Sequence, residues 1–101
     1  MAIMVVDDHP GTRQAAVRHL QHSGFETLDV MTGNDALSML EENPRITFIF
    51  VNLSLGGDVD ADALAARAHS RWPCVPILLT HQIEEMVRLT TPSLARLIAR
   101  D

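Results

Sequence analysis

Two apolar segments of this sequence end in polar side chains of different chemical character. Asp7 and Asp8 follow the apolar residues 3–6, whereas Asn52 follows the continuous apolar run FIFV at residues 48–51. In open α/β sheets, ligands and reactive groups lie at the carboxyl ends of the strands. Carboxylates at such a position are suitable Mg²⁺ ligands. A carboxamide, in contrast, has no anionic oxygen with which to attack an electrophile.

Strand-like and helix-like patterns alternate along the chain and predict the elements that position these residues. Asn34 is a plausible N-cap for the second helix, and Asp60 or Asp62 for the third. The order β-α-β-α-β-α-β argues for a parallel sheet with helices on both faces. The expected strands are residues 3–6, 25–30, 46–51 and 77–80, and the expected helices are residues 10–24, 34–44 and a segment beginning near residue 60.

The C-terminal segment does not fit a regular closing unit of such a sheet. Ile83, Met86 and Val87 have helical spacing, and Pro92 then interrupts the pattern. A fifth strand has room only at residues 87–90, which leaves about five residues for a crossover that normally needs a dozen. A fourth helix, a degenerate fifth strand and an element exchanged between subunits therefore all stay open.

Composition restricts the classes of function. The net charge is −5, all eight cationic residues are arginines, and lysine is absent. This balance disfavours nucleic-acid binding, which depends on clustered cations. The chain has no apolar run long enough for a transmembrane helix and no basic segment typical of a signal peptide. The single cysteine, Cys74, excludes an intrachain disulfide. We expect a cytoplasmic protein.

Three motifs together resemble the receiver domains of response regulators in bacterial two-component signalling. IMVVDDHPGTR (residues 3–13) resembles the opening of that family, VNLSLGG (51–57) its segment at the third strand, and PILLT (76–80) its fourth strand. The resemblance covers residues 3–80 of one domain spanning residues 1–101, and residues 81–101 are atypical. It implies a flavodoxin-like sheet with strand order 2-1-3-4, shortened or rearranged after the fourth strand.

The resemblance also assigns roles to individual positions. Asp7 and Asp8 match the acidic pair that holds Mg²⁺, and Thr80 matches the hydroxyl that binds phosphoryl oxygens. Asn52 stands at the position of the phosphoryl-accepting aspartate. Thr91, before Pro92, stands where the family has a lysine. These changes imply a Mg²⁺ site that is weakened and a domain that requires no cofactor.

The expected function is that of a non-enzymatic pseudo-receiver, a protein-binding and dimerisation module that works independently of phosphorylation. The expected partners are a histidine kinase, a sensor, another receiver or a second copy of the chain, and neither nucleic acid nor membrane. The alternative is a receiver that accepts a phosphoryl group at a substitute residue, for which Thr80, Ser54 and Asp58 are candidates.

Simpler interpretations of the same residues compete with these roles. Asp7 and Asp8 are also suitable acids for the start of a helix, and Asn52 is a common turn former. Thr80 is an ordinary strand residue, so a role in the pocket and a structural role are equally favoured. His19 and His22 share a helix face, but a solvated face explains them better than a metal site.

Overall fold

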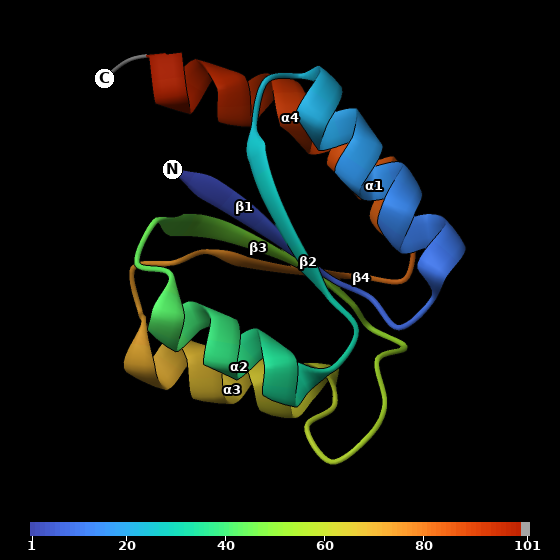
Figure 1. The fold of residues 1–101 in the computed structure, drawn as a ribbon, viewed down its shortest axis with the longest axis vertical. Coiled ribbons are helices and arrows are strands. Elements are labelled where there is room, and N and C mark those ends of the chain that lie inside the picture. Colours follow the sequence, from blue (N-terminus) through green and yellow to red (C-terminus); the bar gives the residue numbers. More distant parts are fainter. Residues whose placement is uncertain (100–101) are drawn as a thin grey trace.

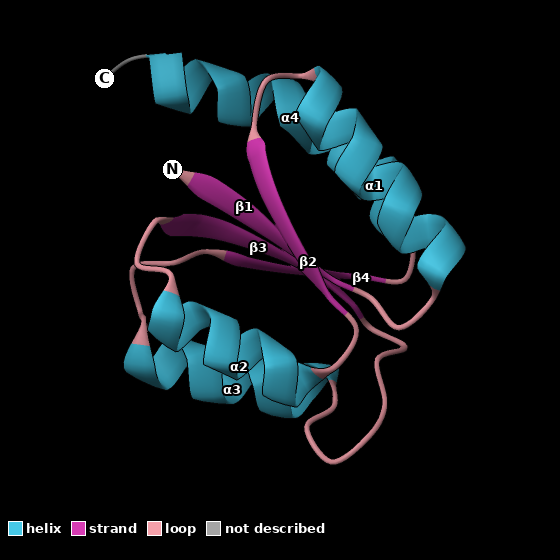
Figure 2. Ribbon diagram, in the orientation of Figure 1, coloured by secondary structure: helices cyan, strands magenta, loops and turns pink. Residues whose placement is uncertain are grey.

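A computed structural model describes the backbone of residues 1–99 and the side chains of residues 1–96. The chain forms one parallel sheet of four strands in the order β2-β1-β3-β4, with four helices around it (Figures 1 and 2). The predicted flavodoxin-like fold and strand order are confirmed. The strands are β1 (Ala2–Val6), β2 (Glu26–Val30), β3 (Ile46–Asn52) and β4 (Ile77–Thr80), and the helices are α1 (Pro10–His22), α2 (Gly33–Glu42), α3 (Ala61–Arg71) and α4 (Ile83–Ala99).

The helices form two layers, one on each face of the sheet. α1 and α4 cover one face, and α2 and α3 cover the other (Figure 2). Side chains alternate along β1 between these layers: Met4 and Val6 pack under α2 and α3, and Ile3 and Val5 under α1 and α4. All five residues of β1 are buried. This central position explains why the strand reads as a continuous apolar run.

Local capping sets where the helices begin. Thr32, not the predicted Asn34, caps α2, because the Thr32 side chain accepts a hydrogen bond from the Asp35 N–H at 3.1 Å. Asp60 caps α3 by accepting from the Ala63 N–H at 2.9 Å, which decides between the two predicted acids. α1 begins with Pro10 after His9, a position where the missing proline N–H has no helical partner to lose.

The chain after β4 forms one helix, and no fifth strand is present among the described residues. Only His81 and Gln82 separate β4 from α4, which is too short for a crossover to another parallel strand. α4 returns directly to the α1 face and packs beside α1, burying Ile83, Val87 and Leu94. The helix contains Pro92 and changes direction along its length (Figure 1). Residues 100–101 of the predicted atypical segment lie outside the described residues.

No helix within the described part of the chain is long and apolar enough to cross a membrane.

Candidate functional site

The site is built where β1 and β3 end side by side. Val6 of β1 and Val51 of β3 are in register, so the next residues, Asp7 and Asn52, emerge together at the carboxyl edge of the sheet. The Asn52 side-chain Nδ2 donates a hydrogen bond to Asp7 Oδ1 at 3.1 Å. Both side chains are buried. The structure thus brings Asp7 and Asn52, two of the residues singled out from the sequence, into direct contact.

The buried carboxylate of Asp7 accepts three hydrogen bonds from protein donors. Its Oδ1 also accepts from the His9 backbone N–H at 3.0 Å, and its Oδ2 accepts from the hydroxyl of Thr12. Asp7 is completely inaccessible to solvent. Burying a carboxylate is costly unless hydrogen bonds compensate it, and three donors supply that compensation here.

The amide of Asn52 uses both of its ends. While Nδ2 donates to Asp7, Oδ1 accepts a hydrogen bond from the Ser54 backbone N–H at 2.9 Å. A carboxylate at this position has the acceptor for Ser54 but no donor for Asp7. The turn role and the pocket role weighed from the sequence are therefore both present, in one side chain.

The residues present do not fit a Mg²⁺ site of the usual kind. Asp8 is exposed, whereas Asp7 already accepts three hydrogen bonds. Mg²⁺ is held by carboxylate oxygens and water in an octahedron. Position 52, where a third carboxylate would be expected, carries the amide of Asn52. Among the described residues, no group of three or more His, Cys, Asp or Glu side chains is placed to hold a metal ion.

Thr80 lies next to Asn52, as predicted, but its hydroxyl has a local partner. The two residues are paired in the β3–β4 ladder, and the Thr80 Oγ1 accepts a hydrogen bond from the Gln82 backbone N–H at 3.0 Å. This contact stabilises the short turn into α4. The structural interpretation of Thr80 therefore has direct support.

Thr91, assigned to the lysine position from the sequence, does not lie at the end of a strand. Thr91 lies inside α4, is 5% exposed, and donates its hydroxyl hydrogen bond to the backbone carbonyl of Val87. The assignment assumed that a strand ends near this residue, and the described chain has a helix there instead. Because Pro92 occurs within that helix, it does not mark the end of a strand either.

Two of the candidate substitute acceptors lie on the loop after β3. Ser54 is exposed, and its Oγ lies 3.5 Å from Nδ1 of His81, which follows β4. Asp58 is exposed farther along the same loop. The structure thus brings Ser54 close to the strand ends together with a histidine.

Arg13 supports the site, and the sequence analysis gave it no role. Its Nε forms an ion pair with Asp29 Oδ2 at 3.0 Å, and its Nη1 donates to the Asp7 backbone carbonyl at 3.0 Å. The guanidinium thus ties the first helix to the ends of β1 and β2. Thr12 was missed in the same way. Both belong to the motif at residues 3–13, where Thr12 follows Asp7 by five residues and Arg13 by six.

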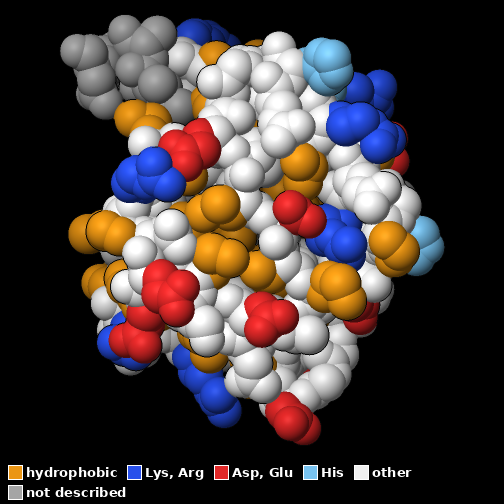
Figure 3. All heavy atoms as spheres, in the orientation of Figure 1, with side chains coloured by type: hydrophobic (Ala, Val, Ile, Leu, Met, Phe, Trp, Pro, Cys, Tyr) orange, Lys and Arg blue, Asp and Glu red, His pale blue; other side chains and the backbone are white. Residues whose placement is uncertain are grey.

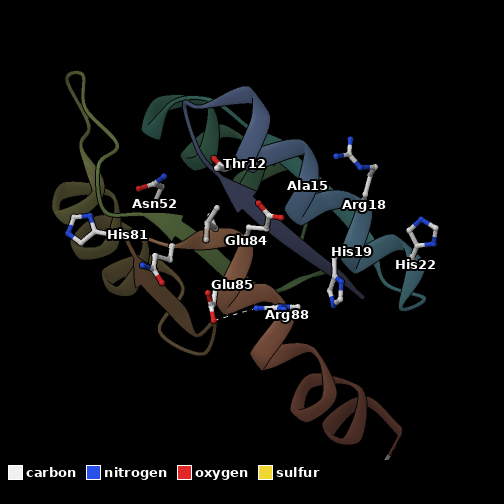
Figure 4. Close-up of a pocket in the computed structure, with 12 residues that line it drawn as sticks. Thr12, Ala15, Arg18, His19, His22, Asn52, His81, Glu84, Glu85 and Arg88 are labelled. Atoms are coloured by element: carbon white, nitrogen blue, oxygen red, sulfur yellow. Dashed lines mark ion pairs between the residues drawn. The ribbon is translucent and has the colours of Figure 1, made fainter.

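An open cleft of about 720 Å³ adjoins the site, between α1 and the first turns of α4. Thr12, Asn52 and His81 lie at one end, and His22 lies at the other (Figure 4). The walls carry both signs of charge, including an ion pair between Glu85 and Arg88 at 3.4 Å. The cleft is therefore lined by polar and charged groups, with Asn52 at one end.

Comparison with solved structures gives the relatives of this fold. The receiver domain of the hybrid histidine kinase CckA matches with 28% identity and a TM-score of 0.71, covering 78% of this chain and 73% of that chain. The chemotaxis response regulator CheY4 of Vibrio cholerae matches with 25% identity and a TM-score of 0.68, covering 77% and 65%.

A third match extends over almost the whole chain. A response regulator receiver protein from Pseudomonas putida matches at 16% identity with a TM-score of 0.75, covering 99% of this chain and 96% of that chain, which supports the fold alone. No family model matches the sequence. By its structural matches, the chain has the fold of the receiver domains found in two-component response regulators and is similar to them.

Proposed function

We propose that this chain is a pseudo-receiver, a receiver domain that acts as a protein-binding module without being switched by phosphorylation. The observation that carries the proposal is the two-ended engagement of Asn52 with Asp7 and the Ser54 N–H. The amide has no anionic oxygen for attack on phosphorus. Its Nδ2 also donates a hydrogen bond to the buried carboxylate of Asp7. The pocket is held in one hydrogen-bonded state by groups within the chain.

The absence of lysine gives independent support. A receiver that stabilises a bound phosphoryl group needs positive charge beside it, and this chain contains no lysine. Arg13 is buried and engaged with Asp29 and with the Asp7 carbonyl. Arg88, which lines the cleft, forms an ion pair with Glu85. Each of these two arginines already faces an acidic side chain, so neither is free to take the place of the lysine.

The partner of the module is a protein of the signalling pathway: a histidine kinase, a sensor or another receiver. Its contact surface is the cleft between α1 and α4, because that surface ends at the pocket and so reports its state. Nucleic acid is not the expected partner, because the net charge is −5 and arginines alternate with acidic side chains on the face in Figure 3.

The test is intact-mass spectrometry of the chain after incubation with acetyl phosphate and Mg²⁺. The wild-type mass should stay unchanged. Asn52→Asp, which restores an acid at the acceptor position, is the matched variant and shows whether the acid alone restores acceptance. A stoichiometric phosphoryl adduct on the wild-type chain would overturn the proposal.

The alternative is acceptance at a substitute residue, and the geometry favours Ser54 among the three candidates. Its hydroxyl lies beside a histidine nitrogen, while the Thr80 hydroxyl is engaged by the Gln82 N–H. Peptide mapping of any adduct, repeated with Ser54→Ala and Thr80→Ala, assigns the site. Loss of the adduct in only one of these variants would identify the acceptor.

A further inference from the structure

β4 is an edge strand whose outward backbone groups can be identified residue by residue. The Ile49 N–H donates to the Pro76 carbonyl at 3.0 Å, and the Leu53 N–H donates to the Thr80 carbonyl at 2.8 Å. Successive residues of a strand direct their backbone groups to opposite sides. Pro76, Leu78 and Thr80 therefore face β3, whereas Ile77 and Leu79 direct their N–H and C=O groups away from the sheet, where no described strand follows.

The two edges of the sheet are protected to different degrees. β2, at the opposite edge, carries the charged Glu26 and Asp29, and charges on an edge oppose pairing with another chain. β4 consists of Ile77, Leu78, Leu79 and Thr80 and has no charged residue. Proline often blocks an edge, but Pro76 occupies a position that faces β3, so every outward N–H of β4 is intact.

The side chains of β4 are also incompletely covered, although they belong to the core. All four residues are half-buried, in contrast to the buried residues 49–52 of the neighbouring strand. Ile77 and Leu79 pack on the α2–α3 face and Leu78 on the α1–α4 face. Half-buried apolar side chains therefore lie beside the free backbone edge on both faces of the sheet.

We propose that this edge binds a second copy of the chain, by antiparallel pairing of the two β4 strands about a two-fold axis at Leu78. In this register Ile77 exchanges both of its outward hydrogen bonds with Leu79 of the second copy, and Leu79 exchanges both with Ile77. Every outward group of Ile77 and Leu79 is then satisfied, and the two sheets become one continuous sheet. The dimer does not depend on whether the chain accepts a phosphoryl group.

The alternative registers and partners are less complementary. A two-fold axis at Leu79 pairs that residue with itself and places Ile77 opposite His81, outside β4. Pairing of β4 with β2 of another copy is open-ended and brings Glu26 and Asp29 to the contact. Self-pairing at Leu78 places Ile77, Leu78 and Leu79 against one another, with Thr80 opposite Pro76 at each end, and brings no charged side chain to the contact. This suits a chain whose net charge of −5 opposes association elsewhere.

The first experiment is sedimentation equilibrium of the full chain over a concentration series. The expected result is a reversible transition from the 11.2 kDa monomer to twice that mass. Leu79→Pro removes an outward N–H and should abolish the dimer while leaving the β3 ladder intact, as judged by circular dichroism. A chain that stays monomeric up to high micromolar concentration, or a dimer that persists in folded Leu79→Pro, would overturn the proposal.

A cross-linking pair tests the register without relying on proline. In a Cys74→Ser background, Leu78→Cys places two thiols opposite each other at a Cα separation of about 4.5 Å, within disulfide range. Ile77→Cys is the matched control, because its own copy lies diagonally, about 7–8 Å away. Oxidation should cross-link the first variant at least tenfold faster than the second. Equal rates, or faster cross-linking of Ile77→Cys, would rule out the axis at Leu78.

Discussion

The side-chain amide of Asn52 donates a 3.1 Å hydrogen bond to the fully buried carboxylate of Asp7. This contact joins the ends of β1 and β3, which are neighbours in the sheet. A second carboxylate at position 52 faces Asp7 as a like charge and needs a cation or a proton between the two groups. The neutral amide removes that requirement by donating a hydrogen bond to Asp7 in place of a second negative charge.

Asn52→Asp should make the stability of the protein depend on Mg²⁺. Without the ion, the two adjacent carboxylates repel and the donor to Asp7 is lost, which should lower the free energy of unfolding by about 1–3 kcal/mol. Added Mg²⁺ should restore much of this loss, because the aspartate supplies the missing carboxylate ligand. The measurement is urea unfolding in EDTA and in Mg²⁺ at matched ionic strength.

The wild-type chain is the control for that experiment, and its unfolding midpoint should be nearly the same in both buffers. An equally large Mg²⁺ effect on the wild type would mean that Asp7 and Asp8 hold the ion despite the amide. In that case the hydrogen-bonded pocket is not the fixed state that we infer.

Asp7 and Asp8 should differ sharply in their contribution to stability, although they are adjacent in sequence. Asp7→Ala removes the acceptor of three hydrogen bonds and leaves the buried Asn52 amide without its partner. The expected loss is at least about 1–3 kcal/mol. Asp8→Ala changes an exposed side chain and should stay within about 0.5 kcal/mol. Comparable losses in urea unfolding would contradict the described pocket.

Much of the fold could be predicted because its strands are short apolar runs bounded by turn residues. The run before Asn52 is buried between two helical layers, so its composition alone reveals a central strand. Residues 87–90 carry no such signal, since four residues within a helical pattern fit either element. The assignment of Thr91 depended on this ambiguity, because the resemblance supplied a strand where the described residues form a helix.

The contacts of the pocket were harder to predict than its position. The sequence places Asp7 and Asn52 at strand ends, but it does not say which donors satisfy the carboxylate. Thr12 and Arg13 reach the pocket because α1 starts immediately after β1 and turns them back over the strand end. That arrangement depends on the angle between helix and sheet, which residue spacing alone does not fix.

Arg13 should contribute more to stability than an exposed arginine in an ion pair. Arg13→Ala removes a nearly buried guanidinium that bonds both Asp29 and the Asp7 carbonyl. The expected loss is about 1.5–3 kcal/mol, typical of hydrogen bonds to charged groups. Arg71→Ala, whose pair with Glu41 is more than half exposed on both sides, should cost at most about 1 kcal/mol. Thermal unfolding of both variants under one buffer condition checks the order, and a reversed order would be inconsistent with the role of Arg13.

Gly33 should not tolerate a side chain, although its backbone is helical. A Cβ at this position lies 2.2 Å from the backbone carbonyl oxygen of Val59, so α2 and the loop before α3 must separate. Gly33→Ala should destabilise the fold by about 1–3 kcal/mol. Gly56→Ala is the matched control, because no atom lies within 4 Å of its Cβ, and it should be nearly neutral. A neutral Gly33→Ala in chemical unfolding would show that the loop packs elsewhere.

Thr91→Lys should destabilise the protein and should not improve phosphoryl acceptance, even together with Asn52→Asp. The side chain at 91 is buried in α4, so placing an ammonium there costs much of its hydration. We expect a loss of about 2 kcal/mol or more. Leu89→Lys, on the same helix but 62% exposed, is the control and should be close to neutral. If the double variant gained more phosphoryl adduct than Asn52→Asp alone in intact-mass spectrometry, residue 91 would have to reach the pocket, and α4 would then have to rearrange into the strand that the described structure lacks.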